Sequence, residues 1–305
     1  MILLILRASY GTLGLLGLVK NKIKMETAYF MLDGKCVFDC HFCSHAKSSN
    51  TENKFLSRII WKEISVNELQ KLANIKELKR VCLQVVSYPG YREDLLNVLE
   101  YIKNFKVSIS VRALNFNEVK MYFDKGVDSV GISVDVVNPE LFRKIRGGDY
   151  FKTISLIKES SERYPWKITT HVIVGMGETD KELVEFFYEM KKYKVNVALF
   201  ALTPIKGTKF ENSMPPSKER YRKIQLARYL IFEKDVPFKV FNFNNTGKLE
   251  NIKYEYSEGL GKAFLTSGCT FCTRPFYNEN PGDEPFNYHI YFKNLESEAK
   301  RIIGS

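Results

Sequence analysis

Three cysteines stand close together near the start of the chain, in the segment CVFDCHFC. Cys36, Cys40 and Cys43 are spaced C-x3-C-x2-C, so one short loop presents three thiolates. A 4Fe-4S cube takes one thiolate on each of its four irons, and soft sulfur ligands select such a centre over hard cations. The triplet therefore predicts a 4Fe-4S cluster with one iron free to bind another ligand.

Zinc is the alternative metal for this loop. A structural zinc site takes four Cys or His ligands, usually from two paired knuckles, and here His41 or His45 would have to supply the fourth. The cysteine spacing is asymmetric and no second knuckle lies nearby in the sequence, which favours the iron-sulfur interpretation.

A second cysteine set combines a late knuckle with an isolated cysteine. Cys269 and Cys272 form a C-x2-C pair in TSGCTFCTRPF, but two thiolates cannot complete a metal site. Cys82 lies in the apolar run RVCLQVV, where strand alternation can direct it into the interior. We expect these three to hold an auxiliary 4Fe-4S cluster, with an unligated buried Cys82 or a zinc knuckle as alternatives. Candidates for the fourth ligand are Ser267, Arg274, Tyr277 and His289.

Composition limits the class of protein. A chain of 305 residues with 45% hydrophobic content can bury one substantial core. Its 46 Lys and Arg against 35 Asp and Glu give a net charge of +11, which favours an acidic partner or an anionic cofactor. No basic run with interleaved aromatics occurs, so we expect no nucleic-acid partner. Six unevenly placed cysteines indicate a reducing cytoplasm rather than a disulfide framework.

The elements between the two cysteine sets repeat six times, as short Val- and Ile-rich runs followed by stretches of helical period. This pattern is typical of parallel βα units, and six units make an incomplete (β/α)6 TIM-type barrel with its site at the carboxyl ends of the strands. An open flavodoxin-like sheet is the structural alternative. The expected strands are Thr27–Leu32, Arg80–Val86, Val107–Val111, Ser129–Val134, Ile168–Val174 and Val197–Leu202. The expected helices are Ser65–Ala73, Glu93–Phe105, Asn117–Lys125, Thr153–Arg163 and Lys181–Lys192.

The barrel, over residues 25–235, is expected to carry an extension at each end. Residues 1–24 are apolar but are interrupted well short of a membrane span, so we expect no membrane partner and a strand or short helix packed on the barrel. Pro215 and Pro216 break the repeat, and Ser217 caps a last helix to about Glu233. Residues 236–305 hold few residues of regular apolar period and are interpreted as a packed tail carrying the knuckle.

The segment CVFDCHFC, with aromatic Phe42 before its third cysteine, resembles the C-x3-C-x-aromatic-C signature of radical S-adenosylmethionine (radical SAM) enzymes. The resemblance implies the partial barrel of that superfamily. It also implies that the open iron binds the methionine end of SAM and that Phe42 lies beside the adenine. An external electron donor would reduce the cluster, which cleaves SAM to a 5'-deoxyadenosyl radical.

A second segment, HVIVGMGET, resembles the G-x-I-x-G-x-x-E segment with which that family contacts adenine. Ile173, Gly175 and Glu178 match, whereas His171 replaces the first glycine. A strand followed by a glycine turn is the structural alternative. Strand alternation predicts that His171 points into the barrel lumen, where it contacts substrate or is a hydrogen-bonded core residue.

The resemblance implies further SAM contacts at two other strand ends. Ser133 and Asp135, in GISVDVV, match positions that bind the ribose hydroxyls, and Arg146, in KIRGGDY, matches an arginine that pairs with the carboxylate. A turn aspartate and a solvated arginine are the alternatives. The family's Gly-Gly-Glu segment is replaced by Ser87–Gly90, which puts the contact to the SAM amino group in doubt there.

An auxiliary cluster inside such a barrel suggests sulfur insertion, as in biotin synthase and lipoyl synthase. The strings RVCLQVV, VIVGMGET and KGT resemble biotin synthase, and Cys82 matches one of its auxiliary-cluster cysteines. The other two positions fall near Val111 or Arg112 and near Thr169, without cysteine. CTFCTRPFYNENPGDEPFNY and LRASYGTLGLLGL instead resemble biotin-synthase-like proteins that act as paired subunits of a split lipoyl synthase.

That second resemblance implies a radical SAM sulfurtransferase of lipoate biosynthesis, which adds sulfur to an octanoyl-lysine on an acidic lipoyl carrier protein or domain. A second radical SAM subunit would be a further partner. Two other functions remain open from the sequence. One is a radical SAM enzyme that acts on a small molecule without inserting sulfur, and the other is a non-catalytic, cluster-binding partner subunit.

Overall fold

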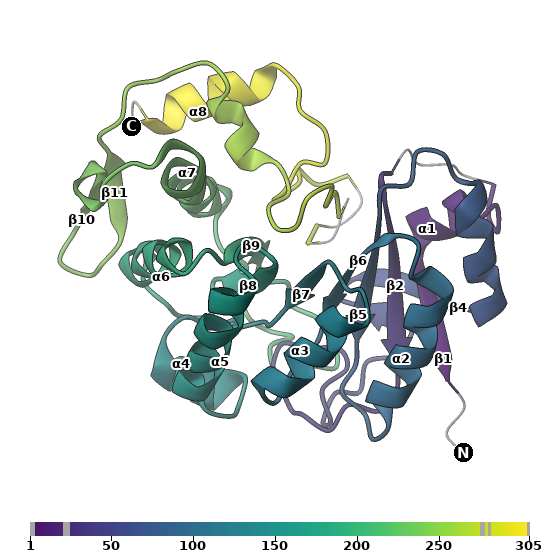
Figure 1. Ribbon diagram of the computed structural model, residues 1–305. Helices are drawn as coiled ribbons and strands as arrows, with labels where there is room; N and C mark the ends of the chain where they lie inside the picture. Colours follow the sequence, from purple (N-terminus) through teal and green to yellow (C-terminus); the bar gives the residue numbers. More distant parts are fainter. Residues whose placement is uncertain (1–3, 21–24, 275–277, 280–281, 304–305) are drawn as a thin grey trace.

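The structure is a computed structural model that describes residues 4–20, 25–274, 278–279 and 282–303. Its centre is a nine-stranded sheet with the order β3-β4-β1-β2-β5-β6-β7-β8-β9, curled into a half-barrel with helices on its outer face (Figure 1). The strands are β1 (Ile5–Ser9), β2 (Thr27–Asp33), β3 (Phe55–Leu56), β4 (Ile59–Ile64), β5 (Arg80–Val85), β6 (Lys106–Ser110), β7 (Ser129–Gly131), β8 (Ile168–Val174) and β9 (Asn196–Ala201).

The six strands predicted for the barrel are β2 and β5 to β9, and they pair in parallel in chain order. The predicted α/β partial barrel is therefore confirmed. Only β7 is clearly shorter than predicted, because the chain leaves the ladder after Gly131 and returns only as an isolated bridge between Asp135 and Val172. Asp135 has a left-handed backbone, with a φ of 62°, at this point.

Helices cover the outer face between successive parallel strands. The predicted helix at Ser65–Ala73 is instead a 3-10 helix, η1, over Val66–Asn74, in which the buried Leu69 and Leu72 stand three residues apart on one side. The barrel helices are α2 (Tyr91–Ile102), α3 (Phe116–Asp124), α4 (Pro139–Ile145), α5 (Tyr150–Arg163), α6 (Asp180–Lys192) and α7 (Lys218–Lys234). The short α4 was not predicted.

The N-terminal segment joins the sheet. β1 pairs antiparallel with β2 on one side and with β4 on the other, and α1 (Tyr10–Leu15) follows it. Arg7 on β1 donates to the carboxylate of Asp33 on β2 at 2.6 Å. The extension therefore widens the wall of the half-barrel on the side of β2.

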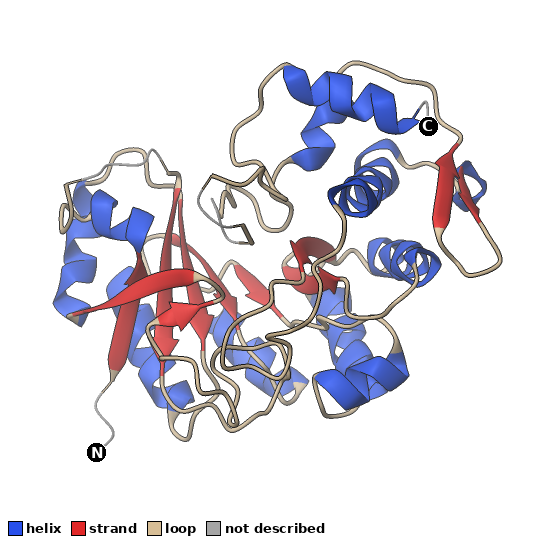
Figure 2. Ribbon diagram, turned by 180° about the vertical axis from the view of Figure 1, so that it is seen from behind, coloured by secondary structure: helices blue, strands red, loops and turns tan. Residues whose placement is uncertain are grey.

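The C-terminal tail holds more regular structure than its sequence indicated, because its apolar residues are divided among short elements. These are the 3-10 helices η2 (Phe238–Val240) and η3 (Leu260–Phe264), strands β10 (Phe241–Phe243) and β11 (Leu249–Ile252), and α8 (Asn294–Ile303). Figure 2 shows α8 lying across α7. The fully buried Arg222 of α7 fixes the tail by donating to the carbonyl of Pro285 at 2.6 Å and to Glu298 at 2.9 Å.

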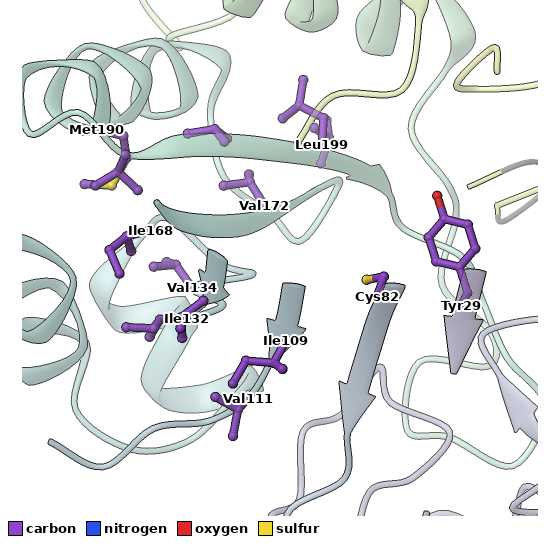
Figure 3. Close-up of a cluster of buried hydrophobic side chains, with 14 of the residues drawn as sticks. Tyr29, Cys82, Ile109, Val111, Ile132, Val134, Ile168, Val172, Met190 and Leu199 are labelled. Carbon is purple, nitrogen blue, oxygen red and sulfur yellow. The ribbon is translucent and has the colours of Figure 1, made fainter. Parts of the chain in front are cut away.

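The core is mostly apolar, and two of its residues, on neighbouring strands, carry reactive groups. Tyr29 of β2 and Cys82 of β5 are direct partners in the parallel register, and Figure 3 shows them next to each other at one end of the cluster of buried side chains. The half-barrel therefore encloses a lumen that carries chemically reactive groups.

Among the described residues, no helix has both the length and the hydropathy needed to cross a bilayer.

Candidate active site

The cysteine loop follows β2 and is held by main-chain hydrogen bonds to neighbouring loops. The N–H of Val37 donates to the carbonyl of Ser87, after β5, and the N–H of His41 donates to the carbonyl of Ile145, at the end of α4, both at 2.9 Å. The thiol of Cys40 lies 3.4 Å from the carbonyl of Arg146. The loop is thus fixed at the carboxyl ends of the strands by the protein chain itself.

All three cysteines of this loop line one cavity of about 170 Å³, the cysteine-loop cavity, together with Phe42, Ser133, Asp135 and Arg146. Burial raises the pKa of Cys43 to about 12 and raises that of Cys40. Both thiols are therefore protonated at neutral pH until a metal ion binds and displaces the proton. Among the described residues, no three His, Cys, Asp or Glu side chains converge on a point that could hold a single metal ion. A cube would take each of the three thiolates at a different iron.

A buried ion pair borders the cysteine-loop cavity. The guanidinium of Arg146 donates to Asp135 at 2.7 Å. Arg112, which the sequence analysis had not selected, lies 3.8 Å from the sulfur of Cys40 and stacks on Phe38 at 3.7 Å. Burial and the nearby Arg146 lower the pKa of Arg112 to about 10, which leaves it charged. The sequence could have indicated Arg112 as a site residue, because it lies just beyond the end of the predicted strand that forms β6. Because Asp135 neutralises Arg146, the charge of Arg112 is the one that would offset part of the negative charge of an iron-sulfur cluster here.

A second cavity of about 230 Å³, the middle cavity, adjoins the first and shares Phe42, Cys43, Ser133 and Asp135 with it. Ile173 also lines the middle cavity. Its further polar residues include Thr203 and Asn278. The structure thus brings most of the predicted SAM contacts together beside the cysteine loop.

Gly175 and Glu178 stand apart from the lining of both cavities. The carboxylate of Glu178 accepts the N–H groups of Gly175 and Met176, each at 2.8 Å, and pairs with Arg220 at 3.0 Å. Gly175 has a φ of +105°, and a side chain there would lie 3.1 Å from Pro216. In this structure, both residues shape the turn after β8.

The second cysteine set meets at a third cavity of about 250 Å³, the tail cavity. Cys82, Cys269 and Cys272 all line it. The knuckle is anchored where two strands begin: Arg80 donates to the carbonyl of Thr270 at 3.0 Å, and Thr27 donates to that of Phe271 at 2.6 Å. The tail cavity thus lies toward the amino ends of the strands, whereas the cysteine loop lies at their carboxyl ends.

The thiols of the tail cavity differ in acidity. A hydrogen bond from Cys269, followed by the charge of Arg274 and the hydroxyl of Tyr29, lowers the pKa of Cys272 to about 6. Burial and then the neighbouring Cys272 raise the pKa of Cys82 to about 11. The pKa of Cys269 is raised, mainly by its hydrogen bond to Cys272. One thiolate is therefore already favoured before any metal binds.

Arg274 is the described fourth-ligand candidate that lines the tail cavity. Its guanidinium donates to the carbonyl of Ser267 at 2.7 Å and stacks on Phe200 at 3.9 Å, while its Nε has no hydrogen-bond partner among the described residues. The hydroxyl of Ser267 accepts the N–H of Leu199 at 2.9 Å, and neither Ser267 nor His289 lines the cavity. Tyr277 lies outside the described residues. Three thiols and the charged guanidinium of Arg274 therefore meet at the tail cavity, and the fourth ligand of the expected cluster stays a prediction.

The middle and tail cavities share Gln84, His171 and Phe200 as lining residues. Gln84 donates to the sulfur of Cys82 at 3.2 Å, and Nδ1 of His171 lies 2.9 Å from the hydroxyl of Ser133. His171 thus faces the lumen, as predicted. Burial, reinforced by Arg274 and Arg146, lowers its pKa to about 3, so His171 is neutral at physiological pH. The two cysteine sets are joined through one lumen.

A wide groove of about 1570 Å³ leads to this lumen from between the β3–β4 hairpin and the loop after β9. It shares Ser57 and Ile205 with the middle cavity and Ile59 with the tail cavity. We call it the entrance groove, because it touches both inner cavities.

Comparisons with known proteins agree with this architecture. The family model described as "Radical SAM superfamily" matches residues 34–188, just over half of the chain. The GTP 3',8-cyclase of Limosilactobacillus fermentum is 26% identical over 195 residues, which are 61% of this chain and 57% of that protein. A biotin synthase of Campylobacter hominis is 29% identical over 249 residues, which are 78% of this chain and 75% of that protein.

Among solved structures, the FeFe-hydrogenase maturase HydG from Carboxydothermus hydrogenoformans has a TM-score of 0.52 at 19% identity, over 68% of this chain and 51% of that one. This likeness shows the shared fold. The present chain spans only about half to three fifths of the length of this maturase and of the cyclase.

Proposed function

Because this chain belongs to the radical SAM superfamily, we propose that it is a sulfur-insertion enzyme, acting as a lipoyl synthase subunit on an octanoyl-lysine of a carrier protein. The family's cofactors are a 4Fe-4S cluster and SAM, and the proposal adds an auxiliary iron-sulfur cluster. Together these groups supply a hydrogen-abstracting 5'-deoxyadenosyl radical and a sulfide that a substrate carbon can take up.

One observation carries the proposal: cysteines from two distant segments line the tail cavity, which shares lining residues with the middle cavity. Cys82 comes from β5, and Cys269 and Cys272 come from the tail. Gln84 and His171 border both cavities. A substrate carbon held beside these two residues lies between the two cofactor sites, which sulfur insertion requires.

The chain's own residues would hold and separate the cofactors. Cys36, Cys40 and Cys43 would bind the first cluster, and the Asp135–Arg146 pair, which lines the same cavity, would present polar groups to SAM. The CTFC knuckle is fixed by hydrogen bonds from the sheet, so its thiols are held in place. The neutral, half-buried His171 presents no charge to an apolar chain in the lumen.

The substrate assignment draws on the lining of the tail cavity and on net charge. Besides its cysteines and Arg274, that cavity is lined mainly by apolar and aromatic side chains such as Met25, Ile59 and Trp61, which suit a saturated acyl chain. The net charge of +11 complements an acidic carrier protein. A second radical SAM subunit would be a further partner.

Iron counting after anaerobic reconstitution tests the auxiliary cluster. We expect about eight irons in the wild type, and about four in Cys269→Ala/Cys272→Ala and in Cys36→Ala/Cys40→Ala. Comparing the two double variants shows which cluster each cysteine set holds, because only Cys36→Ala/Cys40→Ala should lose SAM cleavage under dithionite. Four irons in both the wild type and the knuckle variant would remove the main support for sulfur insertion.

Mass spectrometry of an octanoyl-lysyl peptide tests the reaction, with and without a candidate partner subunit. We expect a gain of sulfur that depends on the knuckle cysteines. A second candidate function is radical chemistry on a small molecule without sulfur insertion. It draws on the relatives named GTP 3',8-cyclase. Deoxyadenosine formed without any sulfur gain would favour it, and failure to cleave SAM would favour a non-catalytic partner subunit.

A further inference from the structure

One polar side chain lies where the three inner cavities meet. Gln84 of β5 lines the cysteine-loop, middle and tail cavities, and it is the one described residue common to all three. It is half-buried, on a strand whose other residues are mostly apolar. A polar amide withdrawn from water in such a strand is costly unless it has a partner. The partner of this amide therefore indicates what the residue does.

That partner is a proposed cluster ligand. Nε2 of Gln84 donates to the sulfur of Cys82 at 3.2 Å. The two residues are two positions apart on one strand, so their side chains leave the sheet on the same face. Cys82 lines the tail cavity, and Gln84 extends from there to the middle and cysteine-loop cavities. The contact is thus built into β5 and does not depend on the path of the tail.

The other two thiols of the tail cavity have a different kind of partner. The hydroxyl of Tyr29 lies 3.7 Å from the sulfur of Cys272, and the hydroxyl of Ser108 lies 3.8 Å from that of Cys269. A hydroxyl can accept a hydrogen bond from a thiol or donate one to a thiolate, so these contacts suit both protonation states. The contact of Gln84 is shorter, and it comes from an amide nitrogen, which only donates.

A donor of this kind matches a sulfur that has lost its proton. A cysteine binds iron as a thiolate, which accepts hydrogen bonds and donates none. Of the two ends of the Gln84 amide, only the nitrogen can then pair with Cys82. A hydrogen bond to an ionised acceptor is roughly twice as strong as one between neutral groups. Metal binding at Cys82 therefore strengthens a contact that the metal-free protein already makes.

We propose that Gln84 is a positioning residue of the auxiliary cluster: its Nε2 donates to the iron-bound sulfur of Cys82, which raises the reduction potential of that cluster and slows its loss of iron. This inference rests on the proposed function, because it assumes an auxiliary cluster on Cys82. A donor beside a ligand sulfur stabilises the electron that the reduced cluster gains. Hydrogen-bond partners of metal ligands also strengthen metal binding.

The test isolates the auxiliary cluster by using the Cys36→Ala/Cys40→Ala background, which lacks the first cluster. An EPR-monitored redox titration measures the reduction potential, and a chelator assay on the same preparations measures iron release. Gln84→Met keeps the length of the side chain and loses the donor. We expect it to make the potential more negative and to speed iron release about 10- to 100-fold. Gln84→Lys, which keeps an N–H donor, should hold the potential at or above that of the background.

Ser110→Ala is the matched control. Ser110 is the ladder partner of Gln84 on β6 and lines the cysteine-loop and middle cavities, but it does not line the tail cavity. Its replacement should leave both the potential and the release rate unchanged.

An unchanged potential in Gln84→Met, with the background holding its iron, overturns the inference. So does an equal negative shift in Gln84→Lys or in Ser110→Ala, because it would show a disturbed lumen rather than a lost hydrogen bond. If the Cys36→Ala/Cys40→Ala background binds no iron, the auxiliary cluster itself is wrong, and the proposed function fails together with this inference.

Discussion

The hydroxyl of Tyr29 lies 3.7 Å from the sulfur of Cys272, although 243 positions separate these residues in the chain. The same hydroxyl accepts the backbone N–H groups of Thr273 at 2.8 Å and Arg274 at 3.1 Å. One strand residue therefore fixes the backbone of the knuckle and contacts one of its thiols. Residues of β2 and of the C-terminal tail therefore form the tail cavity together.

Replacing Tyr29 by Phe should detach the knuckle from the sheet. The variant leaves two partly buried N–H groups without their acceptor, which costs about 1–3 kcal/mol of unfolding free energy. We expect this loss in urea unfolding, together with faster release of only the second set of irons to a chelator. Tyr122→Phe, which removes a hydroxyl bonded to Glu118 on α3, is the control and should destabilise the fold without changing iron release. Equal iron release from both variants would contradict the assigned role.

The thiols of the tail cavity should be distinguishable by their pH dependence. In the metal-free protein, the Cys272 pKa of about 6 makes it about nine-tenths thiolate at pH 7, whereas Cys82, at about 11, stays protonated. Alkylation with iodoacetamide should therefore modify Cys272 first at pH 7, with a rate that falls below pH 6. Removing the charge in Arg274→Met should raise the Cys272 pKa and slow the reaction. If peptide mapping finds Cys269 modified before Cys272, the assignment is wrong.

The strands and the cysteine loop could be predicted because their signals are local. Buried parallel strands appear as continuous apolar runs, and a three-thiol loop is legible from its spacing. The lumenal position of Cys82 also followed from alternation in its strand. These features depend on a few neighbouring residues each.

Other features depend on contacts that no local pattern encodes. The pairing of β1 with β4 joins Leu6 to Ile64, and it decides that the N-terminal segment is part of the sheet. That Arg274 lines the tail cavity, whereas Ser267 and His289 do not, depends on the path of the tail across the lumen. Arg112 carried only a weak signal, its place at a strand end, because its relation to Cys40 appears only once β6 is set beside the cysteine loop.

The Asp135–Arg146 pair predicts a large effect from a small substitution. Asp135→Asn keeps the shape of the side chain but leaves the buried Arg146 charge unpaired, which costs about 3–5 kcal/mol of stability. SAM binding, measured by equilibrium dialysis on the reconstituted protein, should weaken at least about tenfold. Asp39, in the cysteine loop, forms an exposed ion pair with Lys209. Asp39→Asn should lower the unfolding free energy by at most about 1 kcal/mol and leave SAM binding intact. A smaller effect at Asp135 than at Asp39 would exclude the proposed role.

His171 should make the metal-free protein sensitive to acid. Its pKa is about 3 in the folded protein and about 6.5 when unfolded, so below pH 6.5 the unfolded chain binds a proton that the folded chain does not. The stability due to neutral His171 is thus fully present above pH 6.5 and is lost as the pH falls toward 3. Relative to His171→Gln, the wild type should lose about 2 kcal/mol of unfolding free energy between pH 8 and pH 5. Urea titrations of both proteins at these two pH values measure this difference, and an unchanged difference would show that the fold does not hold His171 in its neutral form.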